Sequence, residues 1–143
     1  MAKIGEYRSG DLGKRLTAID ESSKFERTLE IEKAGDFAKA AAAFEQLARS
    51  NPKGEETDKA WYNAGLNYKR AGDSAKAIAA FTRVYTDFPK AAQAPDSLLA
   101  VIEIYDSQLK LGQVGSESVR FLQSYPNDKR APVVRREACL VLA

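Results

Sequence analysis

The chain has 143 residues, of which 44% are hydrophobic and 29% are charged, and this composition fits one globular domain with a buried core. Its 22 Lys and Arg residues nearly balance 20 Asp and Glu residues, and the two signs are interspersed, which argues against a nucleic-acid-binding strip. There is no histidine, and Cys139 is the only cysteine, so a zinc site, a Cys-His or Ser-His-Asp nucleophile and an internal disulfide are excluded. We therefore expect a chain with no enzyme activity, no cofactor and no metal, in which Cys139 is a small core residue.

Residues 1–21 have apolar side chains at helical spacing, but glycines at positions 5, 10 and 13 interrupt the pattern. Three interpretations stay open: the second helix of an upstream repeat, a helix that caps the first repeat, or a flexible tail. Neither this segment nor any later one approaches the roughly 18 consecutive apolar residues of a membrane span, so no direct membrane insertion is expected.

Residues 22–52 predict two helices around a tight turn. The first helix, SKFERTLEIEKAG, contains Phe25 and Leu29, and the second contains Phe44 before Pro52. Between them lies Ala34-Gly35-Asp36, in which Gly35 is suited to a left-handed helix stop and Asp36 to capping the next helix.

Residues 58–91 repeat the same order of residues 37 positions later, around the turn Ala71-Gly72-Asp73. Gly65 lies inside the first helix of this stretch, where glycine costs about 1 kcal/mol relative to alanine. We therefore expect a neighbouring backbone, near Ala77, to approach Gly65 too closely for a Cβ. The residues that share the packing positions, together with the closing proline, are Trp61, Ala64, Gly65, Tyr68, Ala77, Phe81, Val84 and Pro89.

These eight positions resemble the tetratricopeptide repeat, whose pattern of W, L or A, G, Y, then A, F, A and P they follow in order. The resemblance implies an all-α fold, a right-handed superhelical solenoid of antiparallel helix pairs that binds other proteins. The spacing of 37 residues exceeds the usual repeat length of about 34, and we attribute the extra residues to the segment 53–57.

Residues 95–126 predict a third unit, whose first helix opens at Pro95-Asp96. Tyr68 and Tyr105 are 37 residues apart, but Gly72 and Gly112 are 40 apart. We therefore expect a longer first helix and a shorter second helix in this unit. The candidate core residues of the second helix are Val114, Val119, Phe121 and Leu122.

Residues 131–143 predict the first helix of a fourth unit, which begins near Ala131 and buries Val134, Ala138 and either Val141 or Leu142. Its apolar pattern continues to the last residue without a stop signal, which suggests a piece of a longer protein. Residues 1–143 are interpreted as one repeat domain.

The resemblance also implies that the first helices line a concave groove in which a peptide or a partner helix lies. The groove positions carried over to the second unit are Lys59, Tyr62, Asn63, Leu66, Lys69 and Arg70. The neighbouring units make the groove mixed in charge, because they add Phe25, Glu26, Leu29, Glu32 and Lys33 in the first unit and Asp96, Leu99, Ala100, Glu103, Asp106 and Ser107 in the third. Lys69 and Arg70 favour a ligand with acidic and apolar groups, although basic residues in the last turn of a helix are also favoured by its dipole alone.

Three functions are consistent with the pattern. The first is a protein-protein interaction module without catalytic activity. The second rests on the 37-residue spacing and on the Phe88-Pro89 and Tyr125-Pro126 linkers, which look like the bacterial envelope subfamily of these repeats, with outer-membrane assembly lipoproteins and a cell-division coordinator. That resemblance would imply a periplasmic component. The third is a structural spacer that self-associates through apolar ends such as residues 140–142. The sequence leaves the choice between cytoplasm and periplasm open.

Overall fold

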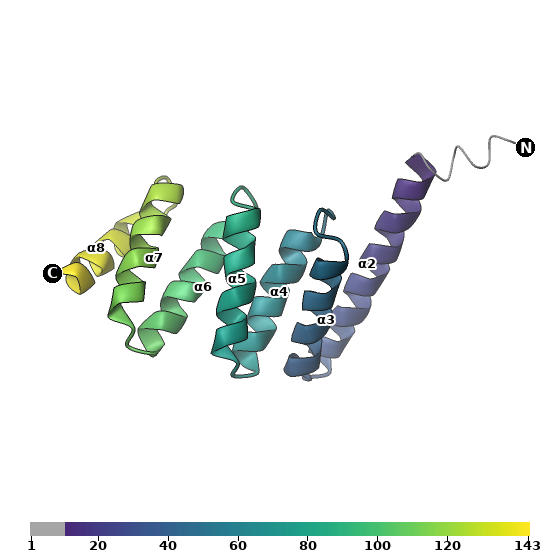
Figure 1. The fold of residues 1–143 in the computed structure, drawn as a ribbon, viewed down its shortest axis with the longest axis horizontal. Coiled ribbons are helices and arrows are strands. Elements are labelled where there is room, and N and C mark those ends of the chain that lie inside the picture. The colour runs from purple at the N-terminus through teal and green to yellow at the C-terminus, as the bar shows by residue number, and fades with distance from the viewer. Residues whose placement is uncertain (1–10) are drawn as a thin grey trace, which may run out of the picture.

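A computed structural model describes residues 11–143, and within that range the chain forms helices and no strand (Figure 1). The expectations for the segment before Asp11, including its glycines at positions 5 and 10, lie outside the described residues. The helices are α2 (Asp11–Lys33), α3 (Phe37–Ser50), α4 (Thr57–Arg70), α5 (Ser74–Asp87), α6 (Ala94–Ser107), α7 (Leu111–Ser124) and α8 (Ala131–Leu142).

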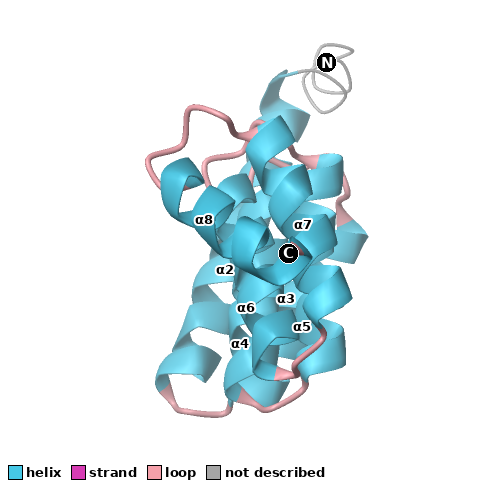
Figure 2. Cartoon of the chain, turned by 90° about the vertical axis from the view of Figure 1, so that its left-hand side faces the viewer, coloured by secondary structure: helices cyan, strands magenta, loops and turns pink. Residues whose placement is uncertain are grey.

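The helices stack as a two-layered solenoid, in which each helix packs against the next one along the chain. Helices α2, α4, α6 and α8 form one layer, here called the first-helix layer, and α3, α5 and α7 form the other (Figures 1 and 2). The all-α solenoid of antiparallel helix pairs predicted from the sequence is confirmed. Each helix described between residues 11 and 143 is too short or too polar to cross a bilayer.

The 37-residue period has a simple origin in segment lengths. Helices α3 to α7 each contain 14 residues, three residues separate the helices of a pair, and six residues separate consecutive pairs. The linkers 51–56, 88–93 and 125–130 are therefore equal in length. The extra residues relative to a repeat of about 34 belong to every linker and not to one insertion.

The core follows the period. Phe44 and Phe81 are fully buried in the second helices of the first two units, and Val84 and Phe121 occupy equivalent positions one period apart. Burial of each of these large side chains contributes on the order of 1.5–3 kcal/mol. Trp61, Ala64, Gly65, Tyr68, Ala77, Phe81 and Val84, the packing residues predicted for the second unit, are all buried.

Position 65 requires a glycine because an aromatic side chain occupies the space that a Cβ would need. A Cβ on Gly65 would lie 2.7 Å from the ring of Phe81, which is too close for any real contact. The prediction that a backbone near Ala77 excludes the Cβ is therefore wrong. One period later the sizes are exchanged, because Ile102 replaces the glycine and Ser118 replaces the phenylalanine, and both are buried.

The first two turns follow the sequence prediction. Gly35 and Gly72 adopt φ values of +86° and +84°, in the left-handed region that glycine enters without steric cost. The carboxylates of Asp36 and Asp73 accept hydrogen bonds from the backbone N–H of Lys39 and Lys76, each at 3.1 Å. Each aspartate thus satisfies one of the free N–H groups at the start of the following helix.

The third turn departs from the prediction. Leu109, one period after Gly72, takes the left-handed conformation with φ of +56°, and Gly112 lies inside α7. Helices α6 and α7 consequently have the same length, so the expected long first helix and short second helix are wrong. The error arose because the turn was located by its glycine, whereas the equivalent position is occupied by a leucine.

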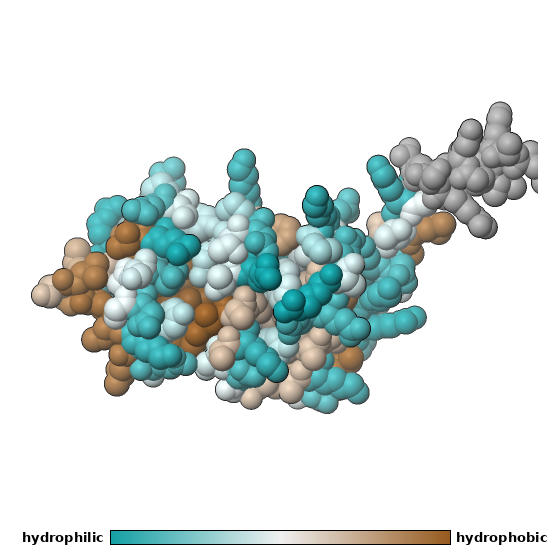
Figure 3. All heavy atoms as spheres, in the orientation of Figure 1, coloured by the Kyte–Doolittle hydropathy of each residue, from teal (hydrophilic) through white to brown (hydrophobic). Residues whose placement is uncertain are grey.

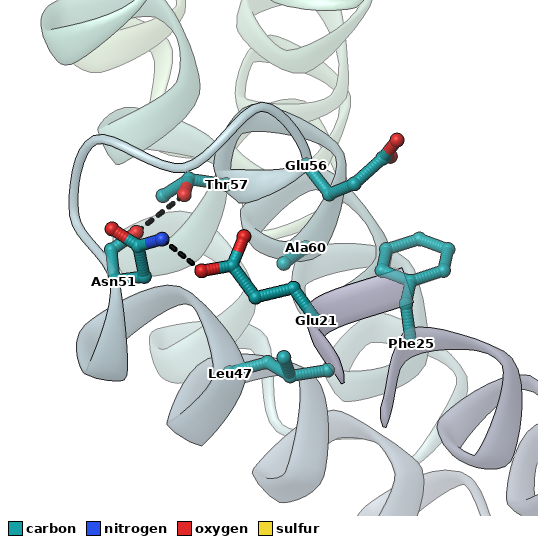
Figure 4. Close-up of a pocket in the computed structure, with 7 residues that line it drawn as sticks. All are labelled: Glu21, Phe25, Leu47, Asn51, Glu56, Thr57 and Ala60. Carbon is teal, nitrogen blue, oxygen red and sulfur yellow. Dashed lines mark hydrogen bonds between the residues drawn. The ribbon is translucent and has the colours of Figure 1, made fainter. Parts of the chain in front are cut away.

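Helix α2 is longer than predicted, because residues 11–21 continue the first helix of the first unit without a break at Gly13. Its N-terminal part rises beyond α3 (Figure 1). Glu21 accepts a hydrogen bond from the amide of Asn51, and the hydroxyl of Thr57 donates to the Asn51 carbonyl at 2.5 Å (Figure 4). The first bond fastens the middle of α2 to the first linker, and the second fastens that linker to the start of α4.

Two predicted core residues near the end of the chain are exposed. Val119 is 38% exposed because Ser118 takes the inward position of α7, and Cys139 lies on the outer side of α8. Val134 and Ala138 are buried as predicted. Val141 packs against the core, whereas Leu142 remains 61% exposed.

Candidate functional site

The first-helix layer contains a groove of about 510 Å³ between α6 and α8, with α7 contributing to its floor. We call it the α6–α8 groove. Two of the residues predicted to line a binding groove, Leu99 and Glu103, lie in it together, and so does Asp106. The remaining lining residues are Ile102, Val114, Arg130, Val133, Val134, Glu137, Leu140 and Val141.

The period explains why these residues meet. Leu99 follows Tyr62 by 37 residues, and Leu140 follows Leu66 by two periods. The groove therefore occupies the face predicted for binding, but one unit later than the second unit on which the sequence prediction centred. Val133 and Leu140 were not identified as groove residues, although extending the 37-residue spacing once more from Lys59 and Leu66 would have found them. Arg130 lies in the third linker and has no predicted groove residue one or two periods earlier.

The groove has an apolar floor and an exposed apolar wall. Ile102, Val114 and Val134 are buried and close its base. Val133 and Leu140 on α8 are 46% and 75% exposed, which is high for large aliphatic side chains. Hydrophobic residues also gather at the α7–α8 end of the face drawn in Figure 3. Contact of a partner with this wall would bury apolar surface that water now covers.

The one cationic side chain lining the groove, Arg130, is neutralised by carboxylates. Its guanidinium donates two hydrogen bonds to Asp128, both at 2.8 Å, and a third to Asp96 of α6. These bonds raise the pKa of Arg130, and they lower the pKa of Asp128 to about 2. Arg130 thus ties the third linker to α6 and leaves little net charge for a ligand.

The rim of the groove is acidic. Glu103 and Asp106 come from α6, and Glu137 comes from α8. The carboxylate of Glu103 lies 3.0 Å from Lys69 Nζ. Among the residues that the structure describes, neither Asp106 nor Glu137 forms an ion pair. The α6–α8 groove therefore combines apolar walls with uncompensated negative charge.

The basic residues predicted to attract ligand carboxylates already have partners. Lys69 reaches across to Glu103, Arg70 pairs with Glu32 of α2, and Lys59 lies 2.9 Å from Glu56. Two of these pairs connect neighbouring first helices. In the structure Lys69 and Arg70 tie units to one another, and an acidic ligand would have to compete with the partners of all three cations.

The other predicted groove residues of α2 and α4 largely support the fold. The ring of Tyr62 meets the ring of Phe81 edge-on, with centroids 5.8 Å apart, and burial raises the pKa of Tyr62. Phe25 packs in the same manner on Phe44, at 5.2 Å. Leu29 and Leu66 are half-buried against the core, and the backbone carbonyl of Asn63 accepts a hydrogen bond from Asn67.

Comparison with known families agrees with this architecture. Residues 29–54 and 59–91 match the tetratricopeptide repeat family. Together with the helical solenoid, the match supports the tetratricopeptide repeat family for this chain. Repeats of this family generally mediate contacts between proteins and are typically not catalytic. No curated protein matches the chain.

Proposed function

We propose that this chain is a non-catalytic interaction module that binds a peptide or a helix of another protein in the α6–α8 groove. The observation that carries the proposal is the groove itself, about 510 Å³ in volume, with Val133 and Leu140 exposed beside a buried apolar floor. Binding in this groove would remove these side chains from water without requiring the helices to separate.

The residues predicted from the sequence divide into two roles under this proposal. Leu99 and Glu103 contact the ligand. The other predicted side chains hold the first-helix layer in place: Phe25, Leu29, Tyr62 and Leu66 by packing, and Lys59, Lys69 and Arg70 by ion pairs. Asn63 accepts a hydrogen bond through its backbone carbonyl.

The test is a selection of random peptides displayed on phage against the immobilised chain, followed by affinity measurements on purified peptides. We expect Leu140→Asp to weaken the selected peptides at least tenfold, because it places a charge on the apolar wall. Leu16→Asp is the matched control, since Leu16 is also exposed, at 56%, but belongs to α2. Equal affinities for the wild type and Leu140→Asp, or no selected peptides at all, would contradict the proposal.

The narrower assignment to the bacterial envelope subfamily is a separate hypothesis. Its support is the 37-residue period, which arises from three equal linkers, two of them opening with Phe88-Pro89 and Tyr125-Pro126. The hydroxyl of Tyr125 donates a hydrogen bond to the carbonyl of Pro89 at 3.1 Å, so the linker 125–130 contacts the linker 88–93 directly. A signal peptide or lipobox encoded upstream in the gene would support a periplasmic role, and an upstream cytoplasmic catalytic domain would contradict it.

A further inference from the structure

We propose that the occupant of the α6–α8 groove is an amphipathic helix of a partner protein, with lysines or arginines flanking its apolar stripe. This inference rests on the proposed function, which it makes more specific by naming the chemistry of the ligand. The sequence pattern of the second unit favoured an acidic ligand, and the arrangement of charges around the α6–α8 groove favours the opposite sign.

The first step is the difference between two neighbouring grooves of the same layer. Between α4 and α6, Lys69 and Glu103 face each other and form an ion pair at 3.0 Å. One period later these positions are occupied by Asp106 and Leu140, which cannot pair. The substitution of leucine for glutamate and of aspartate for lysine replaces an internal ion pair by an exposed apolar side chain beside a free carboxylate.

The second step is the distribution of the carboxylates. Asp106 lies on α6 and Glu137 on α8, so negative charge borders the apolar surface from both helices. Arg130 does not offset it, because Asp96 and Asp128 already occupy its guanidinium. A ligand that matches this field carries positive charge on both sides of an apolar strip.

The third step is the shape of such a ligand. A helix collects apolar side chains on one face at i, i+3, i+4 and i+7 and can carry cations on both borders of that face. An extended strand instead directs alternate side chains to opposite sides, so that half of them would leave the groove. The apolar floor and wall with an acidic border on each helix therefore fit a cationic amphipathic helix.

The experiment uses two fluorescent synthetic helices of about 18 residues, roughly 27 Å long. Both have the same leucine stripe, and their polar positions are lysine in one and glutamate in the other. Anisotropy titrations measure the affinity of each for the whole chain. We expect the lysine helix to bind about tenfold more tightly or better, with a preference that declines as salt is added.

Groove variants test where the preference arises. The double variant Asp106→Lys/Glu137→Lys is expected to reverse the preference in favour of the glutamate helix. Its matched control is Glu26→Lys/Glu55→Lys, which changes the net charge equally at exposed positions outside the groove. Leu140→Ser is expected to weaken both helices, and circular dichroism checks that each variant keeps its helices.

The outcomes separate this inference from the function on which it depends. If both helices bind equally, or if the glutamate helix binds more tightly, and Leu140→Ser weakens them, the groove binds helices but the inferred charge is wrong. If the affinities of both helices and of all selected peptides are unchanged in the Leu140 variants, the proposed function fails as well. A preference for lysine that survives Asp106→Lys/Glu137→Lys overturns the inference. So does sedimentation showing that a second copy of the chain occupies the groove in a Leu140-dependent dimer.

Discussion

The second unit, α4 and α5, and the third unit, α6 and α7, have helices, turns and linkers of equal length but different side chains at equivalent positions. The second unit packs Gly65 against Phe81, whereas the third has Ile102 and Ser118 at those positions. The second unit turns at Gly72, whereas the third turns at Leu109. Segment lengths thus preserve the solenoid, while the packing residues vary as a compensating pair and the turn residues vary without compensation.

Exchanging the packing pair between units gives the largest expected effect. Phe81→Ser alone should lower the free energy of unfolding by about 3–5 kcal/mol, because it leaves a cavity at a fully buried ring. Gly65→Ile alone should cost about 1–3 kcal/mol or more through overpacking. The double variant should cost clearly less than the two together, since it installs the arrangement of the third unit. Urea unfolding followed by circular dichroism measures all three.

The control for this exchange is Gly112→Ala. Gly112 also lies inside a helix, but a Cβ there would meet nothing within 4 Å. Alanine should therefore raise stability by about 0.5–1 kcal/mol. Strictly additive losses in the double variant would show that the two units do not use interchangeable packing.

Changing the turn residues of the third unit should give a smaller change in the free energy of unfolding, in the stabilising direction. Leu109 has φ of +56° and is 81% exposed, so it has the cost of a left-handed side chain without burial to offset it. Lys110 has nearly the backbone angles of Asp36 and Asp73 but provides no side-chain cap. Leu109→Gly with Lys110→Asp should raise the unfolding free energy by about 1–2 kcal/mol in total. Thermal and urea unfolding check this gain.

The reverse change in the second unit serves as the matched control. Gly72→Leu with Asp73→Lys should lower stability by a similar amount, because it introduces the strained and uncapped turn. If the third turn gains nothing from glycine and aspartate while the second loses stability, the two turns are not energetically equivalent.

The turns also show how far the sequence predicted the fold. The boundaries between the paired helices of the first two units could be predicted from Gly35-Asp36 and Gly72-Asp73. Glycine favours a left-handed helix end, and aspartate favours the N-cap of the next helix. At Leu109 the sequence contains no local signal for the turn, because leucine has no preference for a left-handed backbone. Its position follows only from the 37-residue period, which the packing of successive units maintains over local preference.

The candidate site was predicted less well, and for a different reason. Leu99 and Glu103, which were predicted on the first-helix face, line the α6–α8 groove, and their contact with a ligand stays a prediction. The sequence did not reveal that Lys69 and Arg70 pair with carboxylates of adjacent helices, because those partners lie 34 and 38 residues away in the chain. Which charges remain free depends on contacts between units, and such contacts are known only once the units are stacked.

The last comparison between the two units concerns a buried amide in the second unit. Asn67 is fully buried, and its amide donates to the Asn63 carbonyl at 2.9 Å, while its side-chain oxygen has no hydrogen-bond partner among the described residues. The third unit places Ile104 at the equivalent position, 3% exposed. Asn67→Leu should therefore raise the unfolding free energy by about 1 kcal/mol, because it removes an unsatisfied buried acceptor and adds apolar burial.

The opposite substitution, Ile104→Asn, makes the comparison reciprocal. It should cost about 2 kcal/mol or more, since it removes a buried aliphatic side chain and introduces polar atoms that need partners. Urea unfolding of both variants measures the two changes under identical conditions. A loss of stability in Asn67→Leu would mean that the second unit needs the amide, for instance to hold a buried water on its free oxygen. In that case the two units would differ in hydration as well as in packing.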